Sequence, residues 1–239
     1  MTFNSENKHN VSNVNLLGRT ITNDIFDSCL EDHMRIVTNN REAGALCTLR
    51  NDAILGGQED DVISGTEKGE TIYGGNGNDN ISGGKGDDII YGNDGNDVIS
   101  GHAGNDCISG GKGDDSIYGD DGNDVINGNE GGDNLSGGSG KDVFLYYQID
   151  DSMFDSPDKI IDFETGSDTI DISALSKIKG NTIEIKQVNH FSNQKNEMIV
   201  HYNQSENLTS LMLDYNGDGK ADFLIEIIGE INPIADIVT

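Results

Sequence analysis

Apolar residues recur at every ninth position through the middle of the chain, and polar stretches rich in Gly, Asp and Asn separate them. The residues at this phase are Ile63, Ile72, Ile81, Ile90, Ile99, Ile108, Ile117, Ile126, Leu135 and Phe144. A disordered low-complexity tract could share the composition, but it would not keep one apolar residue at a fixed phase. The pattern therefore predicts a repeat architecture in which each nonapeptide is one structural unit.

Each nonapeptide divides into a six-residue turn and a three-residue strand, as in "GGKGDD" followed by "IIY" at residues 83–91. Side chains of a strand alternate between faces, so Ile90 should point inward while Ile89 and Tyr91 point outward. Two nonapeptides complete one flattened coil, and coils stacked about 4.8 Å apart form two parallel sheets. We therefore predict an all-β fold, with a parallel β-roll of ten nonapeptides over residues 51–145.

An acidic residue stands two positions before every apolar residue of the repeat. Turns that are two repeats apart should stack into two columns of carboxylates, which repel one another unless a cation neutralises them. One column holds Asp61, Asp79, Asp97, Asp115 and Asp133, and the other holds Asp88, Asp106, Asp124 and Asp142. Ca²⁺ suits such columns because it binds six to eight oxygen atoms, whereas Mg²⁺ prefers a tight octahedron and Zn²⁺ prefers His or Cys.

Glycines in the turns let the chain bend so that carbonyl oxygens face a bound cation. We expect this role for Gly75, Gly77, Gly84, Gly86, Gly95, Gly104, Gly113, Gly122, Gly131 and Gly140. Five stacked turns on each side leave four gaps per column, and so hold at most eight Ca²⁺. In the first two turns Glu59 and Lys68 replace the inner glycine and Glu70 replaces Asp, with Lys68 directed towards the cation, so about six strong sites remain.

The segments on either side of the repeats predict different structures. Residues 1–50 include an amphipathic stretch at 23–37, which predicts a short helix that either caps the open end of the roll or binds a partner. Residues 146–239 alternate in short apolar runs, which predict antiparallel strands that close the other end of the roll.

The C-terminal segment also offers one further candidate for Ca²⁺. Asp214, Asn216, Asp218 and Asp222 match the start of an EF-hand loop. A polar hairpin with Asn-Gly and Asp-Gly turns explains the same residues. Both interpretations stay open on the sequence.

Several of the repeats resemble a known nonapeptide. "GGNGNDNIS", "GGKGDDIIY" and "GNDGNDVIS" are similar to the repeat-in-toxin (RTX), or haemolysin-type calcium-binding, repeat. Residues 50–239 resemble the C-terminal β-roll and secretion domain of serralysin-type metalloproteases, as in "DSPDKIIDFETGSDTIDISAL" at 155–175 and "LDYNGDGKADFLIEIIG" at 213–229. The resemblance implies Ca²⁺ held between the turns, export of the unfolded chain by type I secretion machinery, and folding outside the cell.

The catalytic motif of those proteases is missing from this sequence. They carry H-E-x-x-H on a helix before the roll, and none of the five histidines here is followed by Glu. We therefore expect a protein without a catalytic site.

Composition restricts the partners and the compartment. A formal net charge of -28 excludes nucleic acid as a partner, and no apolar run reaches the length of a transmembrane helix. "MTFNSENKHNVSN" at the start lacks the apolar region of a secretory signal peptide, whereas "DIVT" at 236–239 resembles the end of a type I export signal. A secreted protein is expected. A Cys29–Cys47 disulfide is compatible with the sequence, and Cys107 should face solvent.

Two functions agree with these observations. In the first, the chain is a secreted, non-catalytic, calcium-binding RTX protein that acts on an extracellular target, such as a glycan or a surface. In the second, it is an accessory or relic C-terminal module of a secreted enzyme system, either a serralysin-like protease tail or a polysaccharide-binding module.

Overall fold

The computed structural model describes residues 14–16, 19–21, 53–175, 177–178, 181–182 and 185–239. The helix expected over residues 23–37 and the cysteines Cys29 and Cys47 lie outside these residues. Near the N-terminus, β1 (Val14–Leu16) and β2 (Arg19–Ile21) pair antiparallel.

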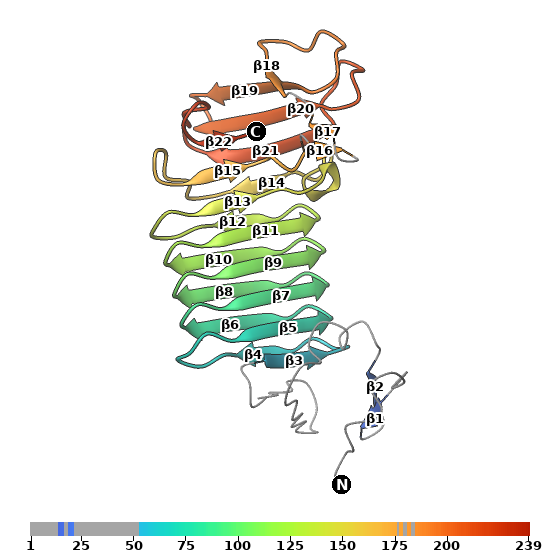
Figure 1. Cartoon of the computed structure of the whole chain (residues 1–239), viewed down its shortest axis with the longest axis vertical. Coiled ribbons are helices and arrows are strands. Elements are labelled where there is room, and N and C mark those ends of the chain that lie inside the picture. The colour runs from blue at the N-terminus through green and yellow to red at the C-terminus, as the bar shows by residue number, and fades with distance from the viewer. Residues whose placement is uncertain (1–13, 17–18, 22–52, 176, 179–180, 183–184) are drawn as a thin grey trace.

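Two sheets run side by side from residue 53 onwards, and Figure 1 shows their strands stacked from β3 and β4 at one end to the C-terminal strands at the other. The eight-stranded sheet has the order β22 (Ile237–Val238), β15 (Thr169–Asp171), β13 (Val143–Leu145), β11 (Val125–Glu130), β9 (Cys107–Lys112), β7 (Ile89–Asp94), β5 (Thr71–Asn76) and β3 (Ala53–Gly57). The ten-stranded sheet has the order β18 (Lys186–Gln187), β19 (Glu197–Asn203), β20 (Leu208–Asp214), β21 (Phe223–Ile228), β14 (Asp158–Ile160), β12 (Asn134–Ser136), β10 (Ser116–Asp121), β8 (Val98–Ala103), β6 (Asn80–Lys85) and β4 (Val62–Ser64). A short pair, β16 (Lys177–Ile178) and β17 (Asn181–Thr182), and one 3-10 turn, η1 (Ile149–Asp151), complete the described elements.

The predicted register of the repeat is confirmed in both sheets. Neighbouring repeat strands pair in parallel two nonapeptides apart, as Ile72 does with Ile90 and Ile81 with Ile99. The apolar positions from Ile63 to Phe144 are buried and at most 3% exposed. Since every strand sends one such side chain between the sheets, the core consists of two facing rows that the repeat itself generates.

Most repeat strands are longer than the three residues predicted. β5, for example, runs through Asn76, and its pairing with β7 continues at Gly75–Asn93 and Asn76–Asp94. Gly75 and Asn93 both have positive φ, at 119° and 77°. One residue with positive φ bends the chain, and strand pairing continues beyond it. The first residues of the predicted six-residue turn are therefore part of the parallel sheet.

The parallel sheets do not end with the last nonapeptide. The interpretation of residues 159–163 and 168–173 as antiparallel strands was wrong, because β14 pairs in parallel with β12 and β15 in parallel with β13. Both strands keep the spacing of the repeat, with an aspartate two residues before a buried isoleucine, at Asp158–Ile160 and Asp168–Ile170. That spacing is enough to place them on the roll even though longer loops lead into them.

An antiparallel cap follows, as predicted, except that within residues 182–188, also expected to be antiparallel, β18 pairs in parallel with β19. β19, β20 and β21 form a meander, and β21 also pairs in parallel with β14, which joins the cap to the roll. Leu211, Phe223 and Ile225 of this cap are buried. The ring of Phe223 meets the buried ring of Tyr146 edge to face, with centroids 5.4 Å apart, so the cap closes the apolar core.

The outer face of the eight-stranded sheet is uncharged along the repeats. Strand alternation turns the following side chains away from the core: Ala53, Leu55, Thr71, Tyr73, Ile89, Tyr91, Cys107, Ser109, Val125, Asn127, Val143 and Leu145. Cys107 is exposed, as predicted. Charged residues of these repeats lie in the turns and at the last positions of β7, β9 and β11, which are Asp94, Lys112 and Glu130, so the middle of the broad face and the edges of the roll differ in chemistry.

Candidate metal-binding turns

The repeat aspartates are buried in spite of their charge. Asp106, Asp115 and Asp124 are 0% exposed, and the other repeat acids from Asp61 to Asp142 are at most 6% exposed. Asp79, Asp97, Asp115 and Asp133 lie in one column and Asp88, Asp106, Asp124 and Asp142 in the other, because each is linked to the next of its column by a hydrogen bond. The predicted columns are therefore present in the fold.

One oxygen of each carboxylate accepts a backbone hydrogen bond from the preceding coil. The amide of Asp79 donates to Oδ1 of Asp97 at 2.7 Å, and the amide of Asp97 donates to Oδ1 of Asp115 at 2.8 Å. The same bond repeats along both columns up to Asp142. Each aspartate thus fixes the height of its own turn against the turn before it.

The second oxygen of each carboxylate has no donor. Within the described residues, no hydrogen-bond partner exists for the buried Oδ2 atoms of Asp79, Asp88, Asp97, Asp106, Asp115, Asp124, Asp133 and Asp142. A buried polar atom without a partner is costly, and a buried charge costs more. Eight such atoms in two rows require either protons or cations.

Carbonyl oxygens share the space beside these unpaired atoms. A methyl group placed on Gly92 would overlap both Oδ2 of Asp97 and the carbonyl oxygen of Gly110. The same holds at Gly101, for Asp106 and the carbonyl oxygen of Gly119. An oxygen-lined space beside glycine Cα atoms matches the ligands that Ca²⁺ takes. Sequence reasoning missed these first glycines of the turns, although they recur in every nonapeptide.

The glycines predicted to supply carbonyls form a second row. Gly104 has a φ of 144°, and a methyl group on it would overlap the carbonyl oxygen of Gly86. Gly122 stands in the same relation to Gly104. Only glycine fits this close backbone stacking. The role of these carbonyls as metal ligands stays a prediction.

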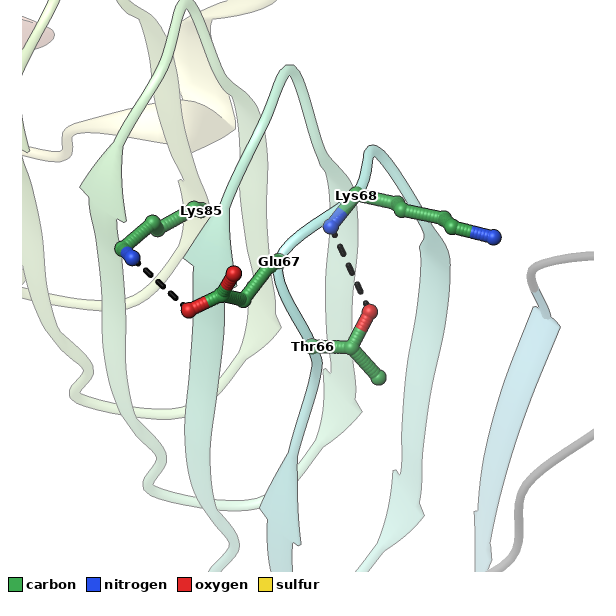
Figure 2. Close-up of polar contacts among 4 residues, drawn as sticks. All are labelled: Thr66, Glu67, Lys68 and Lys85. Atoms are coloured by element: carbon green, nitrogen blue, oxygen red, sulfur yellow. Dashed lines mark hydrogen bonds and ion pairs between the residues drawn. The ribbon is translucent and has the colours of Figure 1, made fainter.

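The first two turns differ from the others, and Figure 2 shows part of the reason. Lys68 is exposed, and its side chain extends away from Glu67 and Lys85, so its charge is not directed into the column as expected. The carboxylate of Glu70 is instead hydrogen-bonded within its own turn. One oxygen accepts from the amide of Thr66 at 3.0 Å, and the other accepts from the Thr66 hydroxyl. Because both of its carboxylate oxygens already accept hydrogen bonds, Glu70 has no unpaired oxygen for a cation, unlike the aspartates of the regular turns. The weakness of this gap stays a prediction, now with a different cause.

Sequence reasoning missed two members of the columns. Asp158 accepts from the amide of Asp133 at 2.9 Å, and Asp168 accepts from the amide of Asp142 at 3.1 Å. Each column therefore continues one turn beyond the nonapeptides. The second oxygen of Asp168 accepts from the amide of Glu164, so this column ends on a carboxylate that the protein itself satisfies.

A third missed carboxylate lies at the end of the first column. Asp151 of η1 is fully buried, and its Oδ2 accepts from the amides of Tyr147 and Gln148. Its Oδ1 has no hydrogen-bond partner in the described part of the chain. Its charge raises the pKa of Asp133, after the larger effects of burial and of the Asp114 charge, so the carboxylates of Asp151 and Asp133 are electrostatic neighbours.

The segment 214–222 forms a hairpin whose carboxylates are already bonded. Asp214 accepts from the amides of Gly217 and Gly219, and Asp222 accepts from the amides of Tyr215 and Asn216. These bonds use both oxygens of Asp214 and leave no unpaired oxygen like those of the columns. The geometry favours the polar hairpin over an additional Ca²⁺ site.

The C-terminal residues are part of the fold. β22 pairs in parallel with β15, and Asp236, which is fully buried, accepts from the amides of Gly166 and Asn232. Its other partner is the hydroxyl of Thr165 at 2.5 Å. The segment that resembles an export signal thus closes the end of the eight-stranded sheet.

Burial raises the pKa of the column aspartates far above their usual range. The pKa rises to about 6 for Asp88, about 7 for Asp79, Asp124 and Asp133, and about 8 for Asp115. The backbone hydrogen bond to each carboxylate lowers its pKa and neighbouring carboxylates raise it, but burial is the largest cause. In the absence of a cation, folding at neutral pH would have to protonate part of these groups.

The fold and the columns define a parallel β-roll with buried, partly unpaired carboxylates in its turns. A family model described as peptidase M10 serralysin C terminal matches residues 51–239. The chain belongs to this serralysin C-terminal family, and the match covers the non-catalytic part of the serralysins.

Individual relatives match a smaller region. Metalloprotease AprA of Pseudomonas entomophila (strain L48) is 39% identical over 95 residues, which are 40% of this chain and 19% of the relative. Serralysin C of Dickeya chrysanthemi is 36% identical over 95 residues, with the same two coverages. The chain thus covers about a fifth of the length of these relatives. The solution structure of the AlgE6R2 subunit of the Azotobacter vinelandii mannuronan C5-epimerase has a TM-score of 0.41 and 23% identity, and covers 77% of this chain and 90% of that chain.

Asp97 provides a test of the columns. In Asp97→Ala, the amide of Asp79 loses its acceptor and the gaps on both sides of Asp97 lose an oxygen. We expect a loss of about 2 kcal/mol of folding free energy in Ca²⁺ and a higher Ca²⁺ midpoint of folding, measured by circular dichroism. Asp61→Ala is the matched control, because Asp61 borders one gap only, and its midpoint should change by less than about twofold. Equal shifts in the two variants would contradict stacked columns.

The raised pKa values predict how pH acts on the metal-free chain. Because these carboxyls have a higher pKa when folded than the usual value of about 4, folding takes up protons. The resulting stability is present at low pH and is lost as pH rises through about 6 to 8. In chelator we expect the β signal in circular dichroism to be strong near pH 5 and to vanish by pH 8, whereas Ca²⁺ should preserve it at pH 8. A metal-free β signal that grows with pH would be the opposite result.

Proposed function

We propose that the turns of the roll bind Ca²⁺ and that Ca²⁺ drives the chain to fold. The observation that carries this proposal is the double row of buried Oδ2 atoms without donors in the described residues, those from Asp79 to Asp124 each beside a glycine carbonyl oxygen. A bound cation supplies the positive charge that these carboxylates lack. The ligands would be Asp79, Asp88, Asp97, Asp106, Asp115, Asp124, Asp133 and Asp142 together with turn carbonyls, for about six ions in the regular gaps.

The proposed number of ions follows from how each gap is satisfied. A gap between two aspartates with unpaired Oδ2 atoms offers a carboxylate oxygen from each turn. The gap at Glu70 offers less, because Thr66 already donates to both oxygens of that side chain. At the far end of the other column, Asp151 brings an unpaired oxygen near Asp133, so an ion at that end would draw a ligand from outside the repeats.

The proposed setting is the outside of the cell, after export of the unfolded chain by type I secretion machinery. Membership of the serralysin C-terminal family supports this setting. No helix in the described residues is long and apolar enough to cross a membrane. Folding on contact with extracellular Ca²⁺ would then hold the exported chain outside, because the folded roll cannot return through the channel.

A second function remains a proposal because the chain covers only 19% of its matched relatives. In that case the roll is an accessory or relic module of a secreted enzyme system, and its own part in that system is Ca²⁺-dependent folding and presentation of a surface. The columns would bind Ca²⁺ in the same way under either function.

Ca²⁺-dependent folding is tested directly by titration. At pH 7 in chelator we expect mostly disordered circular dichroism, because burial of unneutralised carboxylates is unfavourable. Ca²⁺ at about 10⁻⁴–10⁻³ M should restore the β signal, and equal Mg²⁺ should not. A stable β-roll in chelator at low salt and pH 8, or equal rescue by Mg²⁺, would refute the proposal.

Export is tested by removing residues 234–239. We expect a cell that carries a type I exporter to secrete the full chain and to retain the truncated one. Because the deletion also removes β22 and the bonds of Asp236, Thr165→Val is the control: it removes one of those bonds and leaves the C-terminal sequence unchanged. Thr165→Val should be secreted normally. Normal secretion of the truncated chain would place the signal elsewhere.

A further inference from the structure

Along the repeats the outward core side chains of both sheets are uncharged, but on the ten-stranded sheet the hydroxyls of Ser100 and Ser136 donate to the carboxylates of Asp120 and Asp162. The chain has a formal net charge of -28, yet no outward side chain of β3, β5, β7, β9 and β11 within the three core residues of each strand is charged. Ile89 is 41% exposed and Tyr91 37% exposed on this face. A strip of uncharged side chains this regular favours an uncharged partner, since an ionic partner would find no counter-charge on it.

Among the described residues, the ring of Tyr91 stacks on another ring on one side only. The rings of Tyr73 and Tyr91 stack, with centroids 5.0 Å apart and planes 11° from parallel. On its other side, the residue in register with Tyr91 is Ser109 of β9. Because serine has a short side chain, the second face of the Tyr91 ring has only a small polar neighbour on the side of β9.

Polar side chains lie beside Ser109 on this face, and η1 lies at the far side of them. The hydroxyl of Ser109 accepts from Nδ2 of Asn129 at 2.8 Å, and the amide of Asn129 donates to Oδ1 of Asn127 at 2.8 Å. η1 packs against β11, and Asn127 is only 6% exposed although it points outward. We call the part of the strip that runs from the unstacked ring face of Tyr91 across Ser109 to Asn127, beside η1, the notch.

The size of the strip favours a narrow ligand over a protein. Five strands about 4.8 Å apart and two outward side chains wide give an area on the order of 200 Å². A stable protein interface buries about 800 Å² on each partner. A sugar chain is narrow, and it presents apolar C–H faces to an aromatic ring and hydroxyls to Ser and Asn side chains.

We propose that this notch binds a neutral polysaccharide, with one pyranose ring stacked on the open face of Tyr91 and its hydroxyls bonded to Ser109 and Asn129. The site is separate from the metal-binding turns. The inference rests on the proposed function in one respect: the roll must fold in Ca²⁺ before the notch exists.

The test uses the full chain folded in Ca²⁺, with cellohexaose as the neutral probe and an alginate hexasaccharide as the anionic one. Calorimetry should detect cellohexaose and not the alginate fragment, and the affinity should not change when NaCl is raised about tenfold, because no charge takes part. Bound cellohexaose should also slow alkylation of the exposed Cys107, which lies on the same strand as Ser109. Peptide mass spectrometry separates that thiol from Cys29 and Cys47.

Tyr118 provides the matched control. It holds the same place in its nonapeptide as Tyr91, has the same 37% exposure, and lies in β10 of the other sheet. The serines in register with it, Ser100 and Ser136, donate to the carboxylates of Asp120 and Asp162, so its surroundings are acidic where those of Tyr91 are neutral. Tyr91→Ala should weaken binding by about tenfold or more, Tyr91→Phe by less than about twofold, and Tyr118→Ala not at all.

The outcomes separate this inference from the proposed function. A chain that does not fold in Ca²⁺ contradicts the proposed function, whereas a folded chain that binds no cellohexaose overturns the notch alone. Preference for the alginate fragment, or equal losses in Tyr91→Ala and Tyr118→Ala, would also overturn it. So would self-association that Tyr91→Ala abolishes, because a second copy of the chain would then be the occupant.

Discussion

Buried carboxylates with one oxygen bonded and one oxygen unpaired are the constraint on which this structure depends. In Asp97, Oδ1 is held by the amide of Asp79, and Oδ2 faces a space beside Gly92 without any donor. Burial of such a group is unfavourable unless a proton or a cation compensates it. The isoleucine rows stabilise the stacked coils, but the coils can only approach one another where that compensation exists. Apolar packing and charge neutralisation are therefore required together in every turn.

The hydrogen bonds of the turns make each coil dependent on both neighbours. In the inner row, Asp97 accepts from the coil before it. In the outer row the direction reverses, since Asn78 and Asn96 accept from the amides of Asn96 and Asp114 in the following coil. A coil that lacks either neighbour leaves acceptors or amides unbonded, so stability should accumulate along the solenoid and its two ends need other structures to satisfy them.

The sequence allowed the roll to be predicted because each repeat carries its own register. The spacing from aspartate to isoleucine determined the coil length, the two columns and the buried rows, and all of these are confirmed. Asp158 and Asp168 were missed because the loops before them break the nonapeptide period, although the local spacing persists. Asp151 could not be found from the sequence repeat, because it lies outside the nonapeptides and its position depends on η1. Lys68 was misplaced because a sequence gives the identity of a turn residue and not the direction of a long, exposed side chain.

The C-terminal strand ties the proposed export to the fold. Asp236 is fully buried and Ile237 is 8% exposed, whereas Val238 is 44% exposed, so the segment that resembles an export signal is partly covered once the roll has formed. Under the proposed function an exporter would have to reach that segment before the roll forms, and the carboxylates that oppose folding without Ca²⁺ would leave the segment accessible. A roll with an ordinary, charge-free turn sequence would close β22 onto β15 inside the cell. Under the proposed function the acidic columns would therefore have two roles: they would bind the cation outside the cell, and without it they would keep the chain from folding until export is complete.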